Sequence, residues 1–184
     1  MEKLFVAANS YTGNRDIRFD LVRYGNVVGS KGSVVPLFLK QREQGRLTVT
    51  EGSMTRFWIG MDRAVDLVLL ALQKGLGGEV FVPRLPACTV DVLCQAIAPD
   101  LPIEYIGIRP GEKIHETMIT YDESHNVIEF DNYFVVKPTY AAWGGPARTD
   151  GKAATERFSY SSNVTYMLSA EETRQLLHEL GFVS

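Results

Sequence analysis

Residues 23–36 read Arg23-Tyr24-Gly25-Asn26-Val27-Val28-Gly29-Ser30-Lys31-Gly32-Ser33-Val34-Val35-Pro36. The residues from Phe19 to Tyr24 are typical of a strand, and the three glycines that follow predict a loop. Ser33 and Pro36 then predict the start of a helix with Ser33 as its cap. In open α/β sheets, a strand that leads through a loop into a helix places ligands beyond the carboxyl ends of the strands. This stretch therefore predicts an α/β fold with a ligand-binding loop.

The rest of the chain alternates helical and extended patterns, as an α/β fold requires. Helices are predicted at 1–9, 33–44, 62–74, 89–98 and from 169 onward, and strands at 19–24, 47–50, 79–82, 103–108, 127–130 and 133–137. The clearest helix is 62–74, where apolar residues recur at helical spacing: Ala64, Val65, Val68, Leu69 and Leu72. Residues 138–163 show little periodicity and predict an extended or partly disordered arm.

Composition limits the classes of function. The chain has 184 residues, enough for one ordinary domain, and its 45% apolar and 22% charged residues are typical of a globular protein. A formal net charge of -3 with scattered Lys and Arg argues against nucleic acid as a main partner. The apolar stretch 64–72 is too short to span a bilayer, and the one at the amino terminus is too short for a signal peptide. Two cysteines form no disulfide framework, so we expect a cytoplasmic protein.

Several segments together resemble a known family. In chain order they are Lys3-Leu4-Phe5-Val6-Ala7-Ala8-Asn9, residues 23–36, Met54-Thr55-Arg56-Phe57-Trp58-Ile59, Gly78-Glu79-Val80-Phe81-Val82-Pro83, residues 106–116 and Asp122-Glu123-Ser124-His125. Over these segments the chain resembles the C5-inverting UDP-N-acetylglucosamine 4,6-dehydratases. These are extended short-chain dehydrogenase/reductase enzymes that serve pseudaminic acid and surface-polysaccharide synthesis in bacteria.

The resemblance implies an incomplete Rossmann-like parallel sheet with a small α+β lobe on the substrate side. Residues 1–137 would form the C-terminal half of the nucleotide-sugar domain, with Rossmann pieces at 1–28 and 60–83 and the substrate lobe at 29–59 and 84–137. Residues 138–163 would form an irregular arm, and residues 164–184 would contain the C-terminal helix.

The same resemblance implies a NADP-dependent lyase that acts on a UDP-sugar. The family's Gly-x-x-Gly-x-x-Gly cofactor loop, its Asp-Lys acid/base pair and its Tyr-x-x-x-Lys all lie upstream of the segment that matches Lys3. We therefore expect no catalytic residue in this chain, NADP bound mostly by an N-terminal half, and no turnover by the chain alone. A separately encoded N-terminal half or a second copy of the chain is the expected protein partner.

The expected site residues are binding residues. The resemblance implies substrate contacts from Asn26, Arg109 and Glu112, and a cofactor contact from the backbone of Val27. Asn26 can donate to and accept from a sugar hydroxyl or acetamido group, or can simply stabilise its turn. The fork of Arg109 suits a diphosphate and the carboxylate of Glu112 suits a ribose diol, whereas the alternative is a surface salt bridge. Arg56 is a second phosphate candidate, for which a structural role fits equally well.

One spacing imitates the catalytic motif of the family. Tyr133-Phe134-Val135-Val136-Lys137 has Tyr-x-x-x-Lys spacing, but its apolar centre favours a strand. In a strand, the two side chains lie roughly 13 Å apart, whereas catalysis needs neighbours on one helix face. The three histidines show no metal-ligand spacing, so we expect no metal.

Two other functions stay open. A non-catalytic nucleotide-sugar-binding or assembly remnant would retain the binding residues without turnover. A nucleotide-sugar epimerase of the same superfamily is less favoured, because residues 109–116 are closer to the dehydratases.

Overall fold

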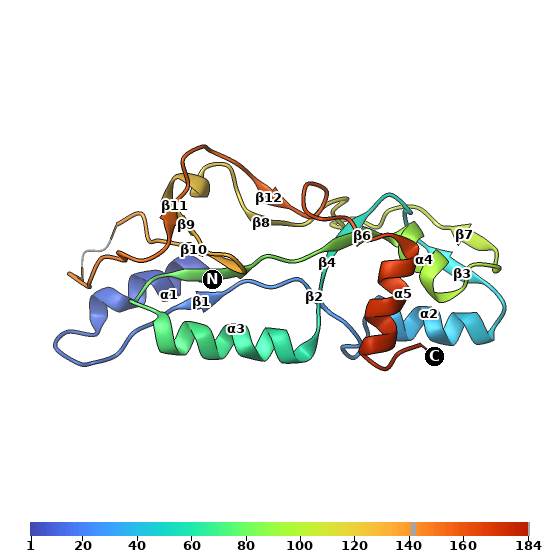
Figure 1. Ribbon diagram of the computed structural model, residues 1–184, viewed down its shortest axis with the longest axis horizontal. Coiled ribbons are helices and arrows are strands. Elements are labelled where there is room, and N and C mark those ends of the chain that lie inside the picture. The colour runs from blue at the N-terminus through green and yellow to red at the C-terminus, as the bar shows by residue number, and fades with distance from the viewer. Residues whose placement is uncertain (141–142, 184) are drawn as a thin grey trace. The chain divides into compact units, whose positions relative to one another are not determined.

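The structure is a computed structural model that describes residues 1–140 and 143–183 (Figure 1). The predicted arm and C-terminal segment therefore include residues outside the description, namely Ala141, Ala142 and Ser184. The helices are α1 (Glu2–Ala8), η1 (Asn9–Tyr11), α2 (Val34–Glu43), α3 (Met61–Lys74), α4 (Val90–Ile97), η2 (Glu123–Asn126) and α5 (Ala170–Glu179). The strands are β1 (Leu21–Val22), β2 (Asn26–Val27), β3 (Leu47–Val49), β4 (Thr55–Ile59), β5 (Val80–Pro83), β6 (Ala87–Thr89), β7 (Ile103–Tyr105), β8 (Thr117–Ile119), β9 (Val127–Glu129), β10 (Tyr133–Val136), β11 (Lys152–Ala153) and β12 (Tyr160–Ser161).

The chain forms two compact units. Unit 1 consists of residues 1–24, 62–84 and 118–160, and unit 2 of residues 25–61, 85–117 and 161–184. Residues 25–28, 60 and 61, expected in the Rossmann pieces, belong to unit 2. The largest difference from the expected lobes is that residues 118–137 belong to unit 1 rather than to the substrate lobe. The reason is that β10 pairs with β5 and β9 pairs with β10, so this hairpin extends the sheet of unit 1. Strand patterns alone do not specify which sheet a hairpin joins.

Unit 1 contains a five-stranded sheet in the order β1-β5-β10-β9-β11. β1 and β5 run parallel, as the fold class requires, whereas β10 runs antiparallel to β5. The α/β fold is thus confirmed, with a mixed rather than a purely parallel sheet. β1 is shorter than predicted because Phe19 bonds outside the strand ladder: its N–H donates to Oδ1 of Asn9 in η1, and its carbonyl accepts from N of Gly78, which precedes β5.

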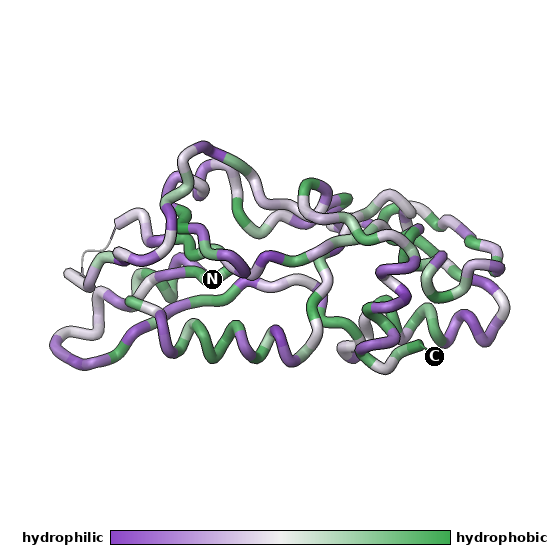
Figure 2. The backbone as a smooth tube through the Cα atoms, viewed as in Figure 1, coloured by the Kyte–Doolittle hydropathy of each residue, from purple (hydrophilic) through white to green (hydrophobic). Residues whose placement is uncertain are grey.

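Helix α3 covers this sheet with a different face from the one that the sequence pattern emphasised. Leu67 and Ala71 pack with Phe81, Ile128 and Val135 in the core. Ala64 is also buried and Leu70 packs partly against this cluster. Four further apolar residues of the helix are exposed, by 40% to 74%: Val65, Val68, Leu69 and Leu72. Figure 2 shows hydrophobic and hydrophilic segments alternating along α3. The helix therefore has a second apolar face that unit 1 leaves uncovered.

Unit 2 builds its core from short strands and three helices. β4 lies centrally, with β2 parallel on one side and β6 antiparallel on the other, and β3 pairs with β7. Residues of α2, α4 and α5 pack with these strands in one hydrophobic cluster that includes Val35, Trp58 and Leu177. Thr89 caps α4 through its side chain, and Ser169 forms a capping box with Glu172 at the start of α5.

Candidate functional site

Unit 2 contains a cavity of about 390 Å³, which we call the Arg109 pocket. It lies by the start of α2, beside strands β3 and β4 and the segment 106–112. The four predicted substrate-binding residues all line it, although they are distant in sequence: Asn26, Arg56, Arg109 and Glu112. Other lining residues include Ser33, Gln41, Thr48, Trp58 and Cys88. Its volume lies in the range of small-molecule sites, roughly 300–1,000 Å³.

Asn26 begins β2, which pairs in parallel with β4 in the register Asn26 with Trp58. Its side chain is exposed and makes no hydrogen bond with the part of the chain that the structure describes. The amide is therefore available to a ligand. Val27 follows in the same strand but is not among the residues that line the pocket, and its carbonyl accepts a hydrogen bond from Ser30 N.

The start of α2 has no side-chain cap. Ser33 occupies the N-cap position with extended backbone, as predicted, but its hydroxyl makes no capping hydrogen bond. This Oγ is buried and has no hydrogen-bond partner in the described ranges. Amides of the first helical turn are left without side-chain acceptors, and the partial positive charge of a helix N-terminus favours an anion.

Arg109 and Glu112, which both line the pocket, belong to one turn. Glu112 N donates to the Arg109 carbonyl at 3.1 Å, and Arg109 N donates to Glu112 Oε2 at 3.2 Å. Gly111 lies between them with φ 87°, a conformation that glycine adopts at little cost. The Arg109 guanidinium forms no ion pair or hydrogen bond with residues 1–140 or 143–183, and the residue is exposed. The turn thus presents an unpaired cation beside a carboxylate.

Arg56 lines the same pocket but directs its donors at the protein. Nη1 donates to the carbonyls of Thr55 and Ile114 at 2.8 and 3.1 Å, and Nη2 donates to that of Lys113 at 2.9 Å. Nε lies 3.7 Å from the Glu116 carboxylate. These contacts favour the structural role for Arg56, in which it holds residues 113–116 against β4.

Two side-chain contacts that line the pocket were not predicted from the sequence. Trp58 Nε1 donates to Cys88 Sγ at 3.0 Å, and burial raises the pKa of Cys88 to about 11. Gln41 Oε1 accepts from Thr48 N at 3.0 Å. A cysteine without a metal-ligand or disulfide pattern, and a glutamine on a helix, carry no signal that would have marked them in advance.

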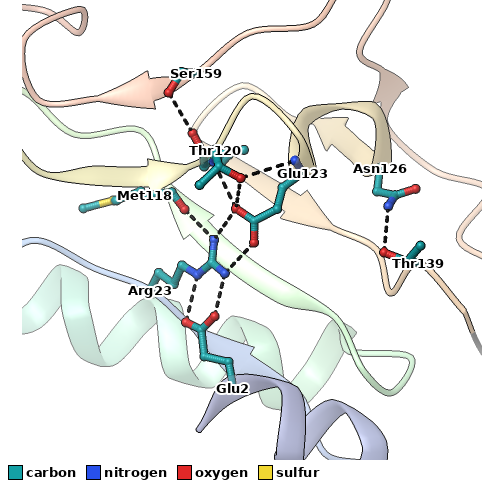
Figure 3. A network of polar contacts seen from close by, with 9 residues as sticks. Glu2, Arg23, Met118, Thr120, Glu123, Asn126, Thr139 and Ser159 are labelled. Carbon is teal, nitrogen blue, oxygen red and sulfur yellow. Dashed lines mark hydrogen bonds and ion pairs between the residues drawn. The ribbon is translucent and has the colours of Figure 1, made fainter.

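A larger cavity of about 580 Å³ lies in unit 1, around a charge network (Figure 3). Arg23 donates to Glu2 at 2.8 Å, to both Glu123 oxygens at 3.1 and 2.7 Å, and to the Met118 carbonyl at 2.6 Å. Burial alone would raise the pKa of Glu123, but hydrogen bonds from Arg23 and Thr120 outweigh it and hold that pKa at about 2. Because Arg23 is already paired with two carboxylates, the smaller Arg109 pocket is the better candidate for an anionic ligand.

The segment 133–137, which has Tyr-x-x-x-Lys spacing, forms the strand β10 over Tyr133–Val136, as predicted. Tyr133 begins β10, and its ring stacks on Phe130 with centroids 4.4 Å apart. Lys137 follows the strand, and its N–H donates to the Asn126 carbonyl. The described residues contain no group of three His, Cys, Asp or Glu that could hold a metal ion. None of the helices in the described part of the chain is long and apolar enough to cross a membrane.

Comparisons with known proteins place the chain in a family. It is 49% identical to the inverting UDP-N-acetylglucosamine 4,6-dehydratase of Campylobacter jejuni strain 81-176, over 98% of this chain and 58% of that protein. A second C. jejuni protein of that name, from strain NCTC 11168, is 42% identical with the same coverage. The X-ray structure of Pen from Bacillus thuringiensis superposes with a TM-score of 0.87 and 31% identity, over 100% of this chain and 56% of that one. The chain thus spans little more than half the length of these relatives.

A family model described as "Polysaccharide biosynthesis protein" matches residues 1–138, which is more than half of the chain. The chain therefore belongs to the polysaccharide biosynthesis protein family.

Proposed function

We propose that the Arg109 pocket binds a UDP-sugar of the UDP-N-acetylglucosamine class. The observation that carries the proposal is the unpaired Arg109 guanidinium, which shares one pocket with the free amide of Asn26 and the uncapped start of α2. Its volume of about 390 Å³ suits part or all of a nucleotide sugar.

Each group has a role set by its chemistry. The Arg109 fork and the amides at the start of α2 would bind the diphosphate, since both favour phosphate oxygens. Glu112 has one carboxylate oxygen, Oε1, not engaged with Arg109 N and able to accept from a ribose hydroxyl. Asn26 would bind a sugar hydroxyl or the acetamido group. Arg56 would act mainly by holding the wall of the pocket.

The reaction proposed for the whole protein is inverting 4,6-dehydration, in which water is removed across C5 and C6 of the sugar and C5 is inverted. This chain would contribute substrate positioning, which is a large part of such catalysis. NADP bound by the whole protein would supply the hydride acceptor and donor that this chemistry needs. Val27 is the one described residue proposed to touch that cofactor, so the described residues fit only a small part of a dinucleotide.

We also propose that another polypeptide completes unit 1. Leu21 N and Arg23 N donate to the carbonyls of Glu79 and Phe81 in and next to β5, which directs the N–H of Val22 to the open edge of β1. Helix α1 has no buried residue, and Leu4 on it is 72% exposed. A separately encoded N-terminal half would pair with this edge and cover the apolar helix faces, and association of two copies is the alternative.

The test of ligand binding is calorimetric titration of the full chain with UDP and with UDP-N-acetylglucosamine. We expect both to bind, and Arg109→Ala to weaken both by roughly 10- to 100-fold, the loss of a charge-assisted contact. Arg63→Ala on α3, an exposed Arg of unit 1, is the matched control and should bind like the wild type. Equal affinities for wild type and Arg109→Ala would contradict the proposal.

The test of activity is incubation with NADP and UDP-N-acetylglucosamine, with products identified by mass spectrometry and NMR. We expect no conversion by the chain alone. Conversion to a 4-keto-6-deoxy sugar is expected when the part of the C. jejuni dehydratase that this chain does not match is supplied as a second polypeptide. A C4 epimer would indicate the epimerase instead, and binding without any conversion would indicate the non-catalytic module.

A cytoplasmic location also stays a proposal. It agrees with two cysteines that form no disulfide framework. Cell fractionation of the natural host with an antibody against the chain would test it.

A further inference from the structure

The C-terminal segment of unit 2 reaches the ligand loop, residues 25–33. Gly29 in that loop has φ 75°, and a Cβ placed on it would lie 1.8 Å from Cζ of Phe182. The Phe182 ring therefore occupies the space where any other residue at position 29 would place its side chain. Glycine at this position serves both the positive φ and the close approach of the ring.

The position of Phe182 follows from the way α5 ends. Gly181 N donates to the His178 carbonyl at 2.9 Å, and Phe182 N donates to the Leu177 carbonyl at 2.8 Å. With Gly181 at φ 78°, these two bonds form a Schellman motif. The motif fixes the residue after the glycine, so the direction of Phe182 is set by helix-stop geometry rather than by a free tail.

A second contact lies at the end of strand β4, next to the ligand loop. Leu180, the last residue before Gly181, lies 3.1 Å from the position of a Cβ on Gly60. Gly60 directly follows Ile59, whose carbonyl accepts from Val28 N at 3.0 Å. Phe182 thus lies against the ligand loop, and Leu180 lies against the strand end to which the loop is hydrogen-bonded.

We propose that Phe182 is a positioning residue for the ligand loop, which it holds so that Asn26 and the start of α2 face the Arg109 pocket. The inference rests on the proposed function for the identity of the ligand, but the positioning itself does not. Loop residues that bind ligands need a rigid support, since a displacement of about 1 Å can cost up to roughly 100-fold in function. Phe182 supplies that support from the far end of the chain.

The experiment compares three variants of the full chain. Phe182→Ala removes the ring, Phe182→Leu keeps an apolar contact, and Leu176→Ala shortens a residue of the same helix that packs on the same core. Titration with UDP should show a loss of at least about tenfold for Phe182→Ala, a loss within about threefold for Phe182→Leu, and wild-type affinity for Leu176→Ala. Equal losses for Phe182→Ala and Leu176→Ala would overturn the proposal, because they would indicate a general effect on stability.

Hydrogen exchange without ligand separates this proposal from the proposed function. The amides of Val28 and Ser30 are hydrogen-bonded within or next to the loop, and we expect them to exchange at least about tenfold faster in Phe182→Ala but not in Leu176→Ala. Unchanged exchange at both amides would refute the role of Phe182, whether or not UDP binds. If wild-type protein fails to bind UDP while the exchange result holds, the proposed ligand is wrong and the positioning role stands.

Discussion

Arg148 and Glu79 form a bidentate ion pair inside unit 1, with 2% and 3% of their side chains exposed. Nε donates to Oε1 at 2.8 Å and Nη2 to Oε2 at 2.7 Å, and Nη2 also donates to the Lys74 carbonyl. The pair attaches the irregular arm to the loop that leads into β5. It explains why a stretch without periodicity is nevertheless placed on the sheet.

Removing one partner of this pair should destabilise unit 1. Arg148→Ala leaves the Glu79 carboxylate buried and unpaired, so we expect the free energy of unfolding to fall by about 3–5 kcal/mol. Urea denaturation of the full chain would measure it. The double variant Arg148→Met with Glu79→Leu leaves no unpaired charge and should lose less. A single variant as stable as the wild type would show that the arm does not depend on the pair.

The ion pairs of Arg23 should make the free energy of unfolding depend on pH in the acidic range. Burial opposes ionisation of Glu123, but hydrogen bonds from Arg23 and Thr120 hold its folded-state pKa at about 2, below the ordinary value of 4.5. A lowered pKa stabilises the fold above the unfolded-state pKa, and this contribution disappears as pH falls from 4.5 toward 2. Because Glu123 is 31% exposed, we expect only about 1 kcal/mol.

The measurement is the unfolding free energy between pH 6 and about pH 2.5, compared with Arg23→Gln. The variant should be less stable at neutral pH and should lose less stability on acidification. Parallel curves for the two proteins would mean that Arg23 does not set the ionisation of Glu123.

Alanine variants of Arg56 and Arg109 should differ in their effect on stability, because the Arg56 side chain is bonded to the protein and the Arg109 side chain is not bonded to any residue in the described ranges. Arg56→Ala removes hydrogen bonds to three backbone carbonyls, those of Thr55, Lys113 and Ile114, so we expect a loss of about 1–3 kcal/mol of stability. Arg109 is exposed and its guanidinium has no described partner, so Arg109→Ala should change the free energy of unfolding by less than about 0.5 kcal/mol. Thermal melts of both variants would check this, and the reverse order would assign Arg109 to the scaffold.

The second apolar face of α3 should drive association. Leu69 and Leu72 are 49% and 74% exposed, so a charge at either position would oppose burial against another chain. We expect Leu72→Lys to shift the purified chain toward monomer in light scattering. Arg63→Lys, on the same helix, is the control and should associate like the wild type. An unchanged mass for Leu72→Lys would exclude this face from the contact.

Local patterns were a good guide to element types in this chain. Local signals predicted the start of α2 at Ser33 and the strand character of Tyr133 to Val136. Caps and propensity could do this because they act over a few residues. The same patterns identified the helix α3 but did not specify its buried face, because its apolar residues occupy more than one face and periodicity does not say which face meets the sheet. The lobe boundaries implied by the resemblance placed the hairpin of β9 and β10 in the substrate lobe, whereas it belongs to unit 1.

The sequence by itself determined the fold class, the family and the residues to examine, because motifs such as Arg23 to Pro36 and Arg109 to Glu116 combine special backbone needs with specific chemistry. Only the tertiary structure decided how each side chain is used. In it, the Arg109 guanidinium has no described partner, and Arg56 donates hydrogen bonds to backbone carbonyls. The Phe182 ring packs against Gly29. Whether a polar group is free or satisfied depends on neighbours that are distant in sequence, and no local pattern specifies those neighbours.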